Sequence, residues 1–271
     1  MIPKFNKSSS ILIGSTALFL VSAAAAFKFK RLPVSTTRSK INMTTGSSSP
    51  TTTSPSLTKA EQKTGKIWDF FADGYSKSPI KDEDSYQKKL AITREFLTPQ
   101  SNTLEFGCGT GGTALLHAPF VKNILAIDIS PRMIEIAQEK AKAAKVDNVQ
   151  FECAGIDSFQ RERVKIQESF DAILGMSILH LLPNKDEVIQ EVFQNLKPGG
   201  YFISSTMCLG DSSMMLVWVI APFSWLGIAP TINSFSKQEL LKSMENAGFH
   251  IEREFHLAKD KPVFLVAKKP S

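Results

Sequence analysis

Residues 104–112 read Leu-Glu-Phe-Gly-Cys-Gly-Thr-Gly-Gly, an apolar strand end followed by a loop with four glycines. Gly107 and Gly109 have no Cβ atom, so the backbone can turn sharply there and approach a ligand closely. Residues 110–112 then let a helix begin against the sheet with free N–H groups. Four glycines within six residues cost backbone entropy unless something must come close. The stretch therefore predicts a strand–turn–helix unit that binds a nucleotide-type cofactor.

A carboxylate stands at the end of the next expected strand. Residues 123–127 read Asn-Ile-Leu-Ala-Ile, and Asp128 follows them directly. A carboxylate in this position can accept hydrogen bonds from both ribose hydroxyls of an adenosine group. Asp128 could instead cap the following helix, but Ser130 before Pro131 is better placed for that role. We therefore assign Asp128 to the ribose.

Two cofactor classes fit these residues, and Glu105 separates them. Gly107, Gly109 and Gly112 give the spacing G-x-G-x-x-G of dinucleotide-binding proteins, which alone is a weak signal. Glu-Phe-Gly-Cys-Gly-Thr-Gly, which begins at Glu105, resembles the first motif of class I S-adenosylmethionine-dependent methyltransferases. A carboxylate there suits a cofactor with a cationic amino-acid tail and would repel a pyrophosphate. We favour the methyltransferase; the alternatives are an NAD(P)-dependent oxidoreductase and a non-catalytic S-adenosylmethionine-binding module.

The rest of the chain alternates between strands and helices, which predicts an α/β fold with a doubly wound, mostly parallel sheet. Residues 59–97 are expected to be helical, with a break at Ser78-Pro79. The other expected helices are 111–120, 131–144, 186–196 and 237–247. The expected strands are 102–106, 124–127, 149–153, 170–174, 201–205, 250–257 and 262–268. The last two resemble the C-terminal antiparallel hairpin of class I methyltransferases, so the resemblance implies a seven-stranded sheet.

This resemblance covers residues 61–271, which we take as one methyltransferase domain. Its further landmarks are Ser-Phe-Asp-Ala-Ile-Leu at 169–174 and Leu-Lys-Pro-Gly-Gly at 196–200. The chain is most similar to the small-molecule branch related to ubiquinone and menaquinone methyltransferases. There the domain begins with a Trp-Asp…Ala…Tyr helix, as residues 68–75 do here. The resemblance implies a small-molecule acceptor and an N-terminal helical cover over residues 61–98.

The resemblance also implies which residues hold S-adenosylmethionine. The backbone of Gly107, Cys108 and Gly109 would cradle its methionine portion, with Glu105 near the ammonium. The remaining expected contacts are Asp128 with the ribose, Ile129 against the adenine, Ile156 and Asp157 near the adenine amino group, Met176 beside the adenosine, and Tyr75 over the sulfonium and carboxylate. For Asp157 a loop cap is an equal alternative. For Tyr75, and more so for Tyr86, the alternative is packing of an amphipathic helix.

His180 is the candidate catalytic residue. A neutral imidazole near the transferred methyl could deprotonate a hydroxyl nucleophile. The alternative is a structural histidine at the start of a short apolar helix, residues 178–182. A thiolate acceptor would need no base. The acceptor atom therefore stays open at this point.

Residues 212–236 form the longest uncharged stretch of the domain, with two tryptophans and two methionines. Prolines interrupt it, so it spans a membrane poorly. It follows the fifth expected strand, where related enzymes place a substrate lid, and its side chains would suit a partly apolar acceptor. A buried helix pair and a membrane-contacting patch are the alternatives.

Composition excludes several classes of function. Residues 1–60 hold eight of the 32 Lys and Arg and none of the 26 Asp and Glu, so the remainder has a net charge of −2. This gives no electrostatic case for nucleic-acid binding. The three cysteines are widely spaced and indicate neither a disulfide framework nor a metal site. The oligomeric state is left open.

The first 60 residues are expected to be a targeting region. Residues 1–26 have a basic start, an apolar run and an Ala-x-Ala end, as in a signal peptide or signal anchor. Residues 11–27 are just long enough for membrane association. Residues 27–60 are basic and rich in Ser and Thr, which predicts disorder and is typical of a transit peptide. The leader resembles the bipartite leaders of complex plastids; the alternatives are the endomembrane system, or the cytoplasm if translation starts at Met43.

Overall fold

The computed structural model describes residues 57–157, 169–211, 224, 229–255 and 261–271. The expectations for residues 1–26 and 27–56, and for most of 212–236, lie outside these residues. No helix among the described residues is both long and apolar enough to cross a bilayer.

A seven-stranded sheet organises the domain, in the order β3-β2-β1-β4-β5-β7-β6. Its strands are β1 (Asn102–Phe106), β2 (Asn123–Asp128), β3 (Val149–Cys153), β4 (Phe170–Met176), β5 (Leu196–Thr206), β6 (His250–Phe255) and β7 (Val263–Lys268). Strands β1 to β5 run parallel to one another, whereas β7 is antiparallel to both β5 and β6. The doubly wound sheet with a C-terminal hairpin is therefore confirmed.

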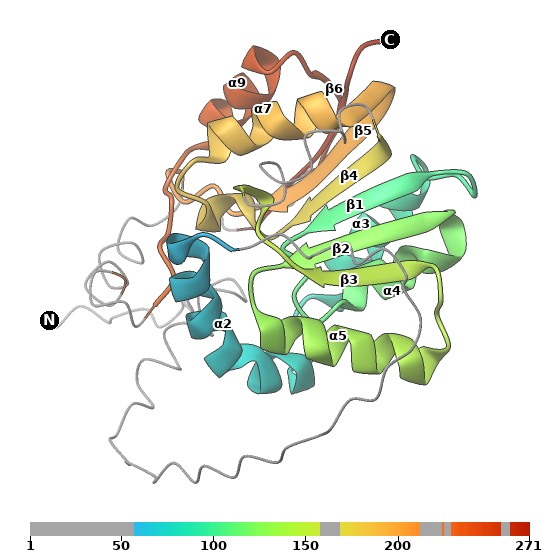
Figure 1. The fold of residues 1–271 in the computed structure, drawn as a ribbon. Helices are drawn as coiled ribbons and strands as arrows, with labels where there is room; N and C mark the ends of the chain where they lie inside the picture. The colour runs from blue at the N-terminus through green and yellow to red at the C-terminus, as the bar shows by residue number, and fades with distance from the viewer. Residues whose placement is uncertain (1–56, 158–168, 212–223, 225–228, 256–260) are drawn as a thin grey trace, which may run out of the picture.

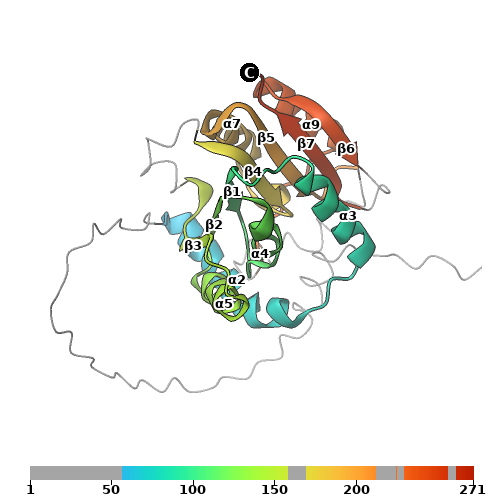
Figure 2. The same ribbon diagram turned by 90° about the vertical axis from the view of Figure 1, so that its right-hand side faces the viewer.

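Helices cover both faces of this sheet (Figures 1 and 2). They are α2 (Lys59–Lys77), α3 (Glu83–Arg94), α4 (Gly112–His117), α5 (Pro131–Ala144), α7 (Lys185–Asn195) and α9 (Lys237–Asn246), with short 3-10 helices η1 (Ala118–Phe120) and η2 (Leu179–Leu181). In Figure 1, α7 and α9 lie above the sheet, and α4 and α5 lie beneath it. The two-layer cover follows from strands that are apolar on both faces.

Alternation along each strand distributes side chains between two cores. Leu104 and Phe106 of β1 belong to the cluster that holds α7 and α9. Ile124 and Ala126 of β2 belong to the cluster that holds α4 and α5. Thr103 and Glu105, the intervening residues of β1, are buried on the opposite face from Leu104. Glu105 thereby comes to lie at the carboxyl end of a central strand.

Two element boundaries differ from the expectation, each for a local reason. The helix expected over 111–120 ends as an α-helix at His117 and continues as η1, because Pro119 has no N–H to donate to a carbonyl four residues back. The strand expected to begin at Tyr201 begins at Leu196, which pairs with Phe170 before a bulge restores regular pairing at Tyr201. The Lys-Pro-Gly-Gly sequence thus lies within β5.

Candidate active site

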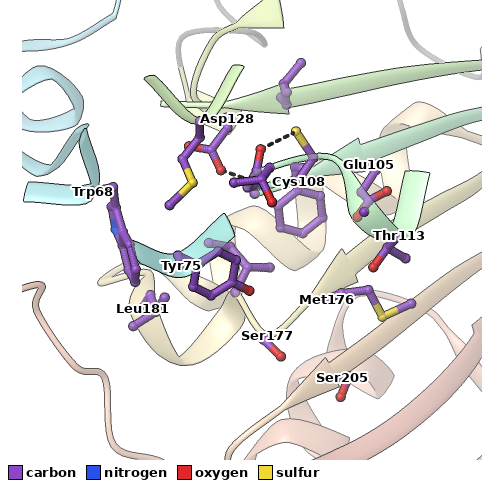
Figure 3. A pocket seen from close by; sticks show the side chains of 18 of the residues that line it. Trp68, Tyr75, Glu105, Cys108, Thr113, Asp128, Met176, Ser177, Leu181 and Ser205 are labelled. Atoms are coloured by element: carbon purple, nitrogen blue, oxygen red, sulfur yellow. Dashed lines mark hydrogen bonds between the residues drawn. The ribbon is translucent and has the colours of Figure 1, made fainter. Parts of the chain in front are cut away.

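A cavity of about 490 Å³ lies at the carboxyl ends of the parallel strands. Its walls come from the loop after β1, the ends of β2, β4 and β5, the η2 segment, and helices α2 and α3. Ligands of doubly wound sheets bind at this edge, where the strand order reverses between β1 and β4. Figure 3 shows the side chains that converge there.

The glycine loop forms the floor of this cavity through its backbone. Gly107, Gly109 and Gly111 have φ angles of 65°, 53° and 76°, in the left-handed region that favours glycine. A Cβ at Gly111 would meet Ala137 and Phe151 at 2.8 Å, whereas a Cβ at Gly112 would meet nothing within 4 Å. The third constrained glycine is therefore Gly111, and the literal G-x-G-x-x-G spacing that ends at Gly112 is not the structural pattern.

Asp128 links the glycine loop to the next helix. Its two carboxylate oxygens accept hydrogen bonds from the backbone N–H groups of Gly109 and Ser130, each at 2.9 Å. Ser130 Oγ accepts from Met133 N at 3.1 Å, so Ser130 caps α5 as expected. Burial raises the pKa of Asp128, and the two backbone donors oppose this shift. Each oxygen keeps a second lone pair that could accept from a ribose hydroxyl.

Glu105 is a buried carboxyl group beside the glycine loop. It is 2% exposed, lines the cavity, and its Oε2 atom has no hydrogen-bond partner among the described residues. Burial, with Asp128 nearby, raises the pKa of Glu105 to about 8. A buried polar atom without a partner is costly and indicates that a ligand completes the site. An ammonium group at this atom would supply both a donor and an opposite charge, which fits the methionine end of S-adenosylmethionine.

Helix α2 is fastened across this end of the cavity. Asp69 Oδ1 accepts from Ser130 Oγ at 2.6 Å and from Arg132 N at 3.1 Å, so it satisfies a donor at the start of α5. A Cβ at Gly65 would meet the Ile129 carbonyl oxygen at 2.3 Å, which shows how closely the helix approaches the turn after β2. Trp68 and Tyr75 of α2 line the cavity (Figure 3).

The two tyrosines of the N-terminal helices both line the cavity. The ring of Tyr75 lies centrally among the side chains of Figure 3; the residue is 46% exposed, and the partial burial of its hydroxyl raises the pKa of that group. The Tyr86 hydroxyl lies 3.2 Å from Thr113 Oγ1 at the start of α4. Tyr86, for which helix packing was favoured, thus reaches the cavity as Tyr75 does.

The structure brings together most of the residues expected around the cofactor. The cavity lining includes Tyr75, Glu105, Gly107, Cys108, Gly109, Asp128, Ile129, Ile156 and Met176. Burial raises the pKa of the Cys108 thiol well above its usual range, so this side chain is a neutral part of the wall. Asp157 lies outside the lining, and its Oδ1 accepts from Asn184 Nδ2 at 3.2 Å. The contact with the adenine amino group expected for Asp157 stays a prediction.

His180 also lies outside the cavity lining. It is 3% exposed, its Nδ1 lies 3.0 Å from Thr206 Oγ1, and its backbone N–H donates to the same oxygen at 3.2 Å. Burial lowers the pKa of His180 to about 4, so the ring is neutral at pH 7. A general base must reach the proton it removes directly or through one water. The geometry favours a positioning role for His180, and its action as a base stays a prediction.

Three cavity residues had no site role in the sequence analysis. Lys89 of α3 donates from Nζ to Ser205 Oγ at the end of β5, at 3.0 Å. Ser177, directly after β4, has a φ angle of 59° and lies exposed in the cavity lining. A left-handed non-glycine residue is a strained feature that clusters at functional sites. Only their position after parallel strands could have pointed to Ser177 and Ser205; no sequence signal indicates Lys89.

Comparisons with known proteins agree with this geometry. A family described as "Methyltransferase domain" matches residues 97–252. The malonyl-[acyl-carrier protein] O-methyltransferase of Priestia megaterium is 28% identical over 210 residues, which cover 75% of this chain and 72% of that protein. For the enzyme of that name from Bacillus cereus, 37% identical over 129 residues, the alignment covers 44% of this chain and 45% of that protein. The demethylmenaquinone methyltransferase of Leptospira interrogans is 28% identical over 196 residues, 63% of this chain and 76% of that protein.

Solved structures show the same fold. A putative methyltransferase from Bacillus halodurans superimposes with a TM-score of 0.57 at 16% identity and covers 69% of this chain and 100% of its own. The family match spans more than half of the chain and includes the glycine loop, Asp128 and the strands that carry the cavity. The chain therefore belongs to the family of methyltransferase domains and is an S-adenosylmethionine-dependent methyltransferase with the class I fold.

Proposed function

We propose that this enzyme methylates a small, partly apolar acceptor, with Glu105 and Asp128 holding the cofactor. The observation that carries the cofactor assignment is the buried Oε2 atom of Glu105, which has no partner among the described residues. An ammonium group would satisfy it, whereas the pyrophosphate of a nicotinamide cofactor would meet the buried Glu105 and the partly buried Asp128, neither of which suits an anion.

The acceptor side of the cavity supports an apolar substrate. Ile80, Leu181 and Leu182 line the cavity together with the aromatic ring of Phe71. Two similar proteins are named as methyltransferases of malonyl-[acyl-carrier protein] and of demethylmenaquinone. We therefore expect an acceptor whose reactive atom enters beside Ser177 and whose apolar part contacts this wall.

The chain's own residues position the reactants. When bound, S-adenosylmethionine supplies an electrophilic methyl carbon, so the protein must chiefly align the acceptor and exclude water. The glycine loop and Asp128 would hold the cofactor from the sheet side, and Trp68 and Tyr75 would cover it from α2. The Tyr75 ring can also face a sulfonium through its π-electrons.

We propose that residues 212–236 close the acceptor pocket as a lid. Most of the segment lies outside the described residues, but its end supports the proposal. Asn233 donates from its backbone to the His180 carbonyl at 2.8 Å and from Nδ2 to the Leu182 carbonyl at 3.0 Å, and Phe235 is buried. This end is therefore attached to the η2 wall. Trp218→Ala or Trp225→Ala should reduce turnover while cofactor affinity stays within about threefold; equal losses in both would refute the lid.

We also propose that residues 1–60 direct the enzyme to a plastid or the endomembrane system and that residues 11–27 mediate membrane association during targeting. The support is the sequence pattern of the leader. A fluorescent fusion of residues 1–60 should leave the cytosol; a diffuse cytosolic signal would favour initiation at Met43.

Calorimetry on the full chain tests the proposed cofactor assignment. S-adenosylmethionine and its demethylated product should bind, and NAD and NADP should not, because the carboxyl groups of Glu105 and Asp128 disfavour the pyrophosphate. Tight binding of a nicotinamide cofactor without binding of S-adenosylmethionine would refute the assignment. Transfer of a labelled methyl group to a panel of apolar acceptors then identifies the substrate.

A further inference from the structure

Lys89 is a cationic side chain that lines the cavity far from the expected ribose site. It extends from α3 to the end of β5, where its Nζ donates to Ser205 Oγ at 3.0 Å. Ser205 is 3% exposed and its carbonyl accepts from the Ser177 backbone N–H at 2.7 Å. The ammonium is therefore directed to a fixed position by a buried serine.

Lys89 has no acidic partner among the described residues. Its charge interacts with Asp82, but the Asp82 carboxylate is engaged by Lys261 Nζ at 2.8 Å and by Ser85 N at 3.2 Å. Burial lowers the pKa of Lys89 most, and the positive charge of Lys261 lowers it further. Since buried charges are normally paired, a partly buried ammonium with only a neutral hydroxyl partner is suited to an anion from outside the chain.

The order of the strands places this ammonium at the acceptor end. Asp128 ends β2 and Ser205 lies near the end of β5, and β1 and β4 lie between those strands. Three strand spacings separate them by about 14 Å. Figure 3 shows Asp128 and Ser205 at opposite ends of the group of side chains. An anion at Lys89 therefore lies on the β5 side of the glycine loop, away from the ribose carboxylate.

The surroundings define the rest of the ligand. Ile80 and Leu90 line the same cavity on the α3 side, and Leu181 and Leu182 line it on the η2 side. An anionic group at Lys89 would thus be attached to an apolar body in contact with these side chains. A purely apolar acceptor would leave the ammonium without a partner and dehydrated, which is unfavourable.

We propose that Lys89, held by Ser205, binds an anionic oxygen group of the acceptor, a carboxylate or a phosphate, and so selects amphiphilic acids over uncharged molecules of the same shape. This inference rests on the proposed function, because it assigns the charge of the substrate that the cavity accepts. It names a specificity-determining residue and leaves the methylated atom open.

Binding of three eight-carbon probes tests the proposal. Octanoate, octyl phosphate and octan-1-ol share one apolar tail and differ in the head group. Each is titrated calorimetrically into the full chain saturated with S-adenosylhomocysteine at pH 7. The wild type should bind at least one of the two anions about 10- to 100-fold more tightly than the alcohol, the range for a hydrogen bond to a charged group. The anion that binds more tightly separates carboxylate from phosphate recognition.

Variants of two adjacent lysines, Lys89 and Lys88, show which residue causes the preference for an anion. Lys89→Met keeps the length and apolar stem and should reduce the preference to within about threefold, whereas Lys89→Arg should keep most of it. Lys88→Met is the matched control, because Lys88 is exposed on the same helix with its Nζ 4.3 Å from the Phe255 ring centroid. It should retain the full preference. Thermal unfolding shows whether each variant is folded.

Three results would overturn the proposal. The first is a wild type that binds the alcohol as tightly as both anions, or that binds none of the three probes measurably. The second is an unchanged preference in Lys89→Met. The third is a Lys89→Met variant that loses S-adenosylhomocysteine affinity instead, which would assign Lys89 to the carboxylate of the cofactor. Failure of the wild type to bind S-adenosylhomocysteine at all would instead refute the proposed cofactor assignment, so the two failures are distinguishable.

Discussion

The two ends of the cavity are built from different kinds of groups. At the expected ribose and methionine positions, the cavity is lined by residues 107–110 of the glycine loop and by two carboxyl groups near the ends of the consecutive strands β1 and β2. At the β5 end the cavity is lined by side chains brought together from α3 and β5, and Lys89 and Ser205 are 116 positions apart in the sequence. The first arrangement is local in sequence and the second exists only in the folded chain.

This difference explains why the cofactor is recognisable from the sequence and the acceptor is not. A tight loop needs particular residue types at fixed spacing, because left-handed φ angles and close packing exclude side chains. A pocket wall needs only suitable chemistry at points in space, which many sequences can supply. Variants at the two ends should therefore fail in different ways.

The largest expected effect is on the glycine loop. Gly111→Ala adds a Cβ 2.8 Å from Ala137 and Phe151 at a φ angle of 76°. Backbone strain and overpacking should together lower the free energy of unfolding by about 2–5 kcal/mol. Gly112→Ala is the matched control, and it should be neutral or stabilising by up to about 1 kcal/mol. Urea denaturation of both variants measures the free energies of unfolding. An equal loss of stability in Gly112→Ala would favour the G-x-G-x-x-G pattern, which ends at Gly112.

The next effect concerns the carboxylate at the end of β2. Asp128→Ala should weaken cofactor binding by about 2–3 kcal/mol, roughly 30- to 150-fold, because a pair of charge-assisted hydrogen bonds is lost. It also removes the acceptor for the N–H groups of Gly109 and Ser130, so some stability should be lost as well. Calorimetry with S-adenosylhomocysteine measures the affinity. An affinity within threefold of the wild type would mean that Asp128 acts only inside the protein.

The smallest effect should come from His180, at the acceptor end. His180→Leu removes the ring partner of Thr206 Oγ1 and leaves this oxygen only the backbone N–H of residue 180, so it should cost about 1–3 kcal/mol of stability, whereas His180→Asn should cost less. The pKa of His180 is lowered to about 4 in the folded protein, from 6.5 in the unfolded chain. As the pH falls below 6.5 the unfolded chain therefore binds a proton that the folded protein does not, and stability decreases. His117, whose pKa is also lowered to about 4, acts in the same pH range.

Turnover distinguishes a positioning His180 from a catalytic one. In His180→Asn the pH profile of kcat between pH 6 and 9 should keep its shape, because a neutral buried ring does not titrate there. A general base would instead be revealed by a loss of about 100-fold or more and by the disappearance of one limb of the profile.

Most of the fold could be predicted from the sequence, because the strand and helix periods are regular and their caps are explicit. Ser130 and Ser236 cap the helices expected after them, and α5 begins and ends at the expected residues. The errors arose where tertiary pairing overrides local signals. Residues 197–200 were expected to lie between a helix and a strand, but pairing of Leu196 with Phe170 draws them into β5.

The site was predictable only where one residue type is required. Glu105 and Asp128 were expected from their places at strand ends, and the cavity contains both. Asp157 was expected from the family resemblance and His180 from its place after the fourth strand. In the structure they contact Asn184 and Thr206, and their roles at the cofactor and the acceptor stay predictions. Lys89 was missed because a lysine on an amphipathic helix has no distinguishing pattern; only its contact with Ser205 reveals its direction.

The central claim is that Glu105 selects a cofactor with an ammonium group. Counting the protons released on binding tests this claim most directly. With a pKa of about 8, Glu105 is largely protonated at pH 7 in the free protein, whereas pairing with an ammonium requires the carboxylate. Binding of S-adenosylhomocysteine should therefore release close to one proton more in the wild type than in Glu105→Gln, as measured by calorimetry in buffers of different ionisation enthalpy. An equal proton count in the two proteins, with equal affinity, would contradict the account.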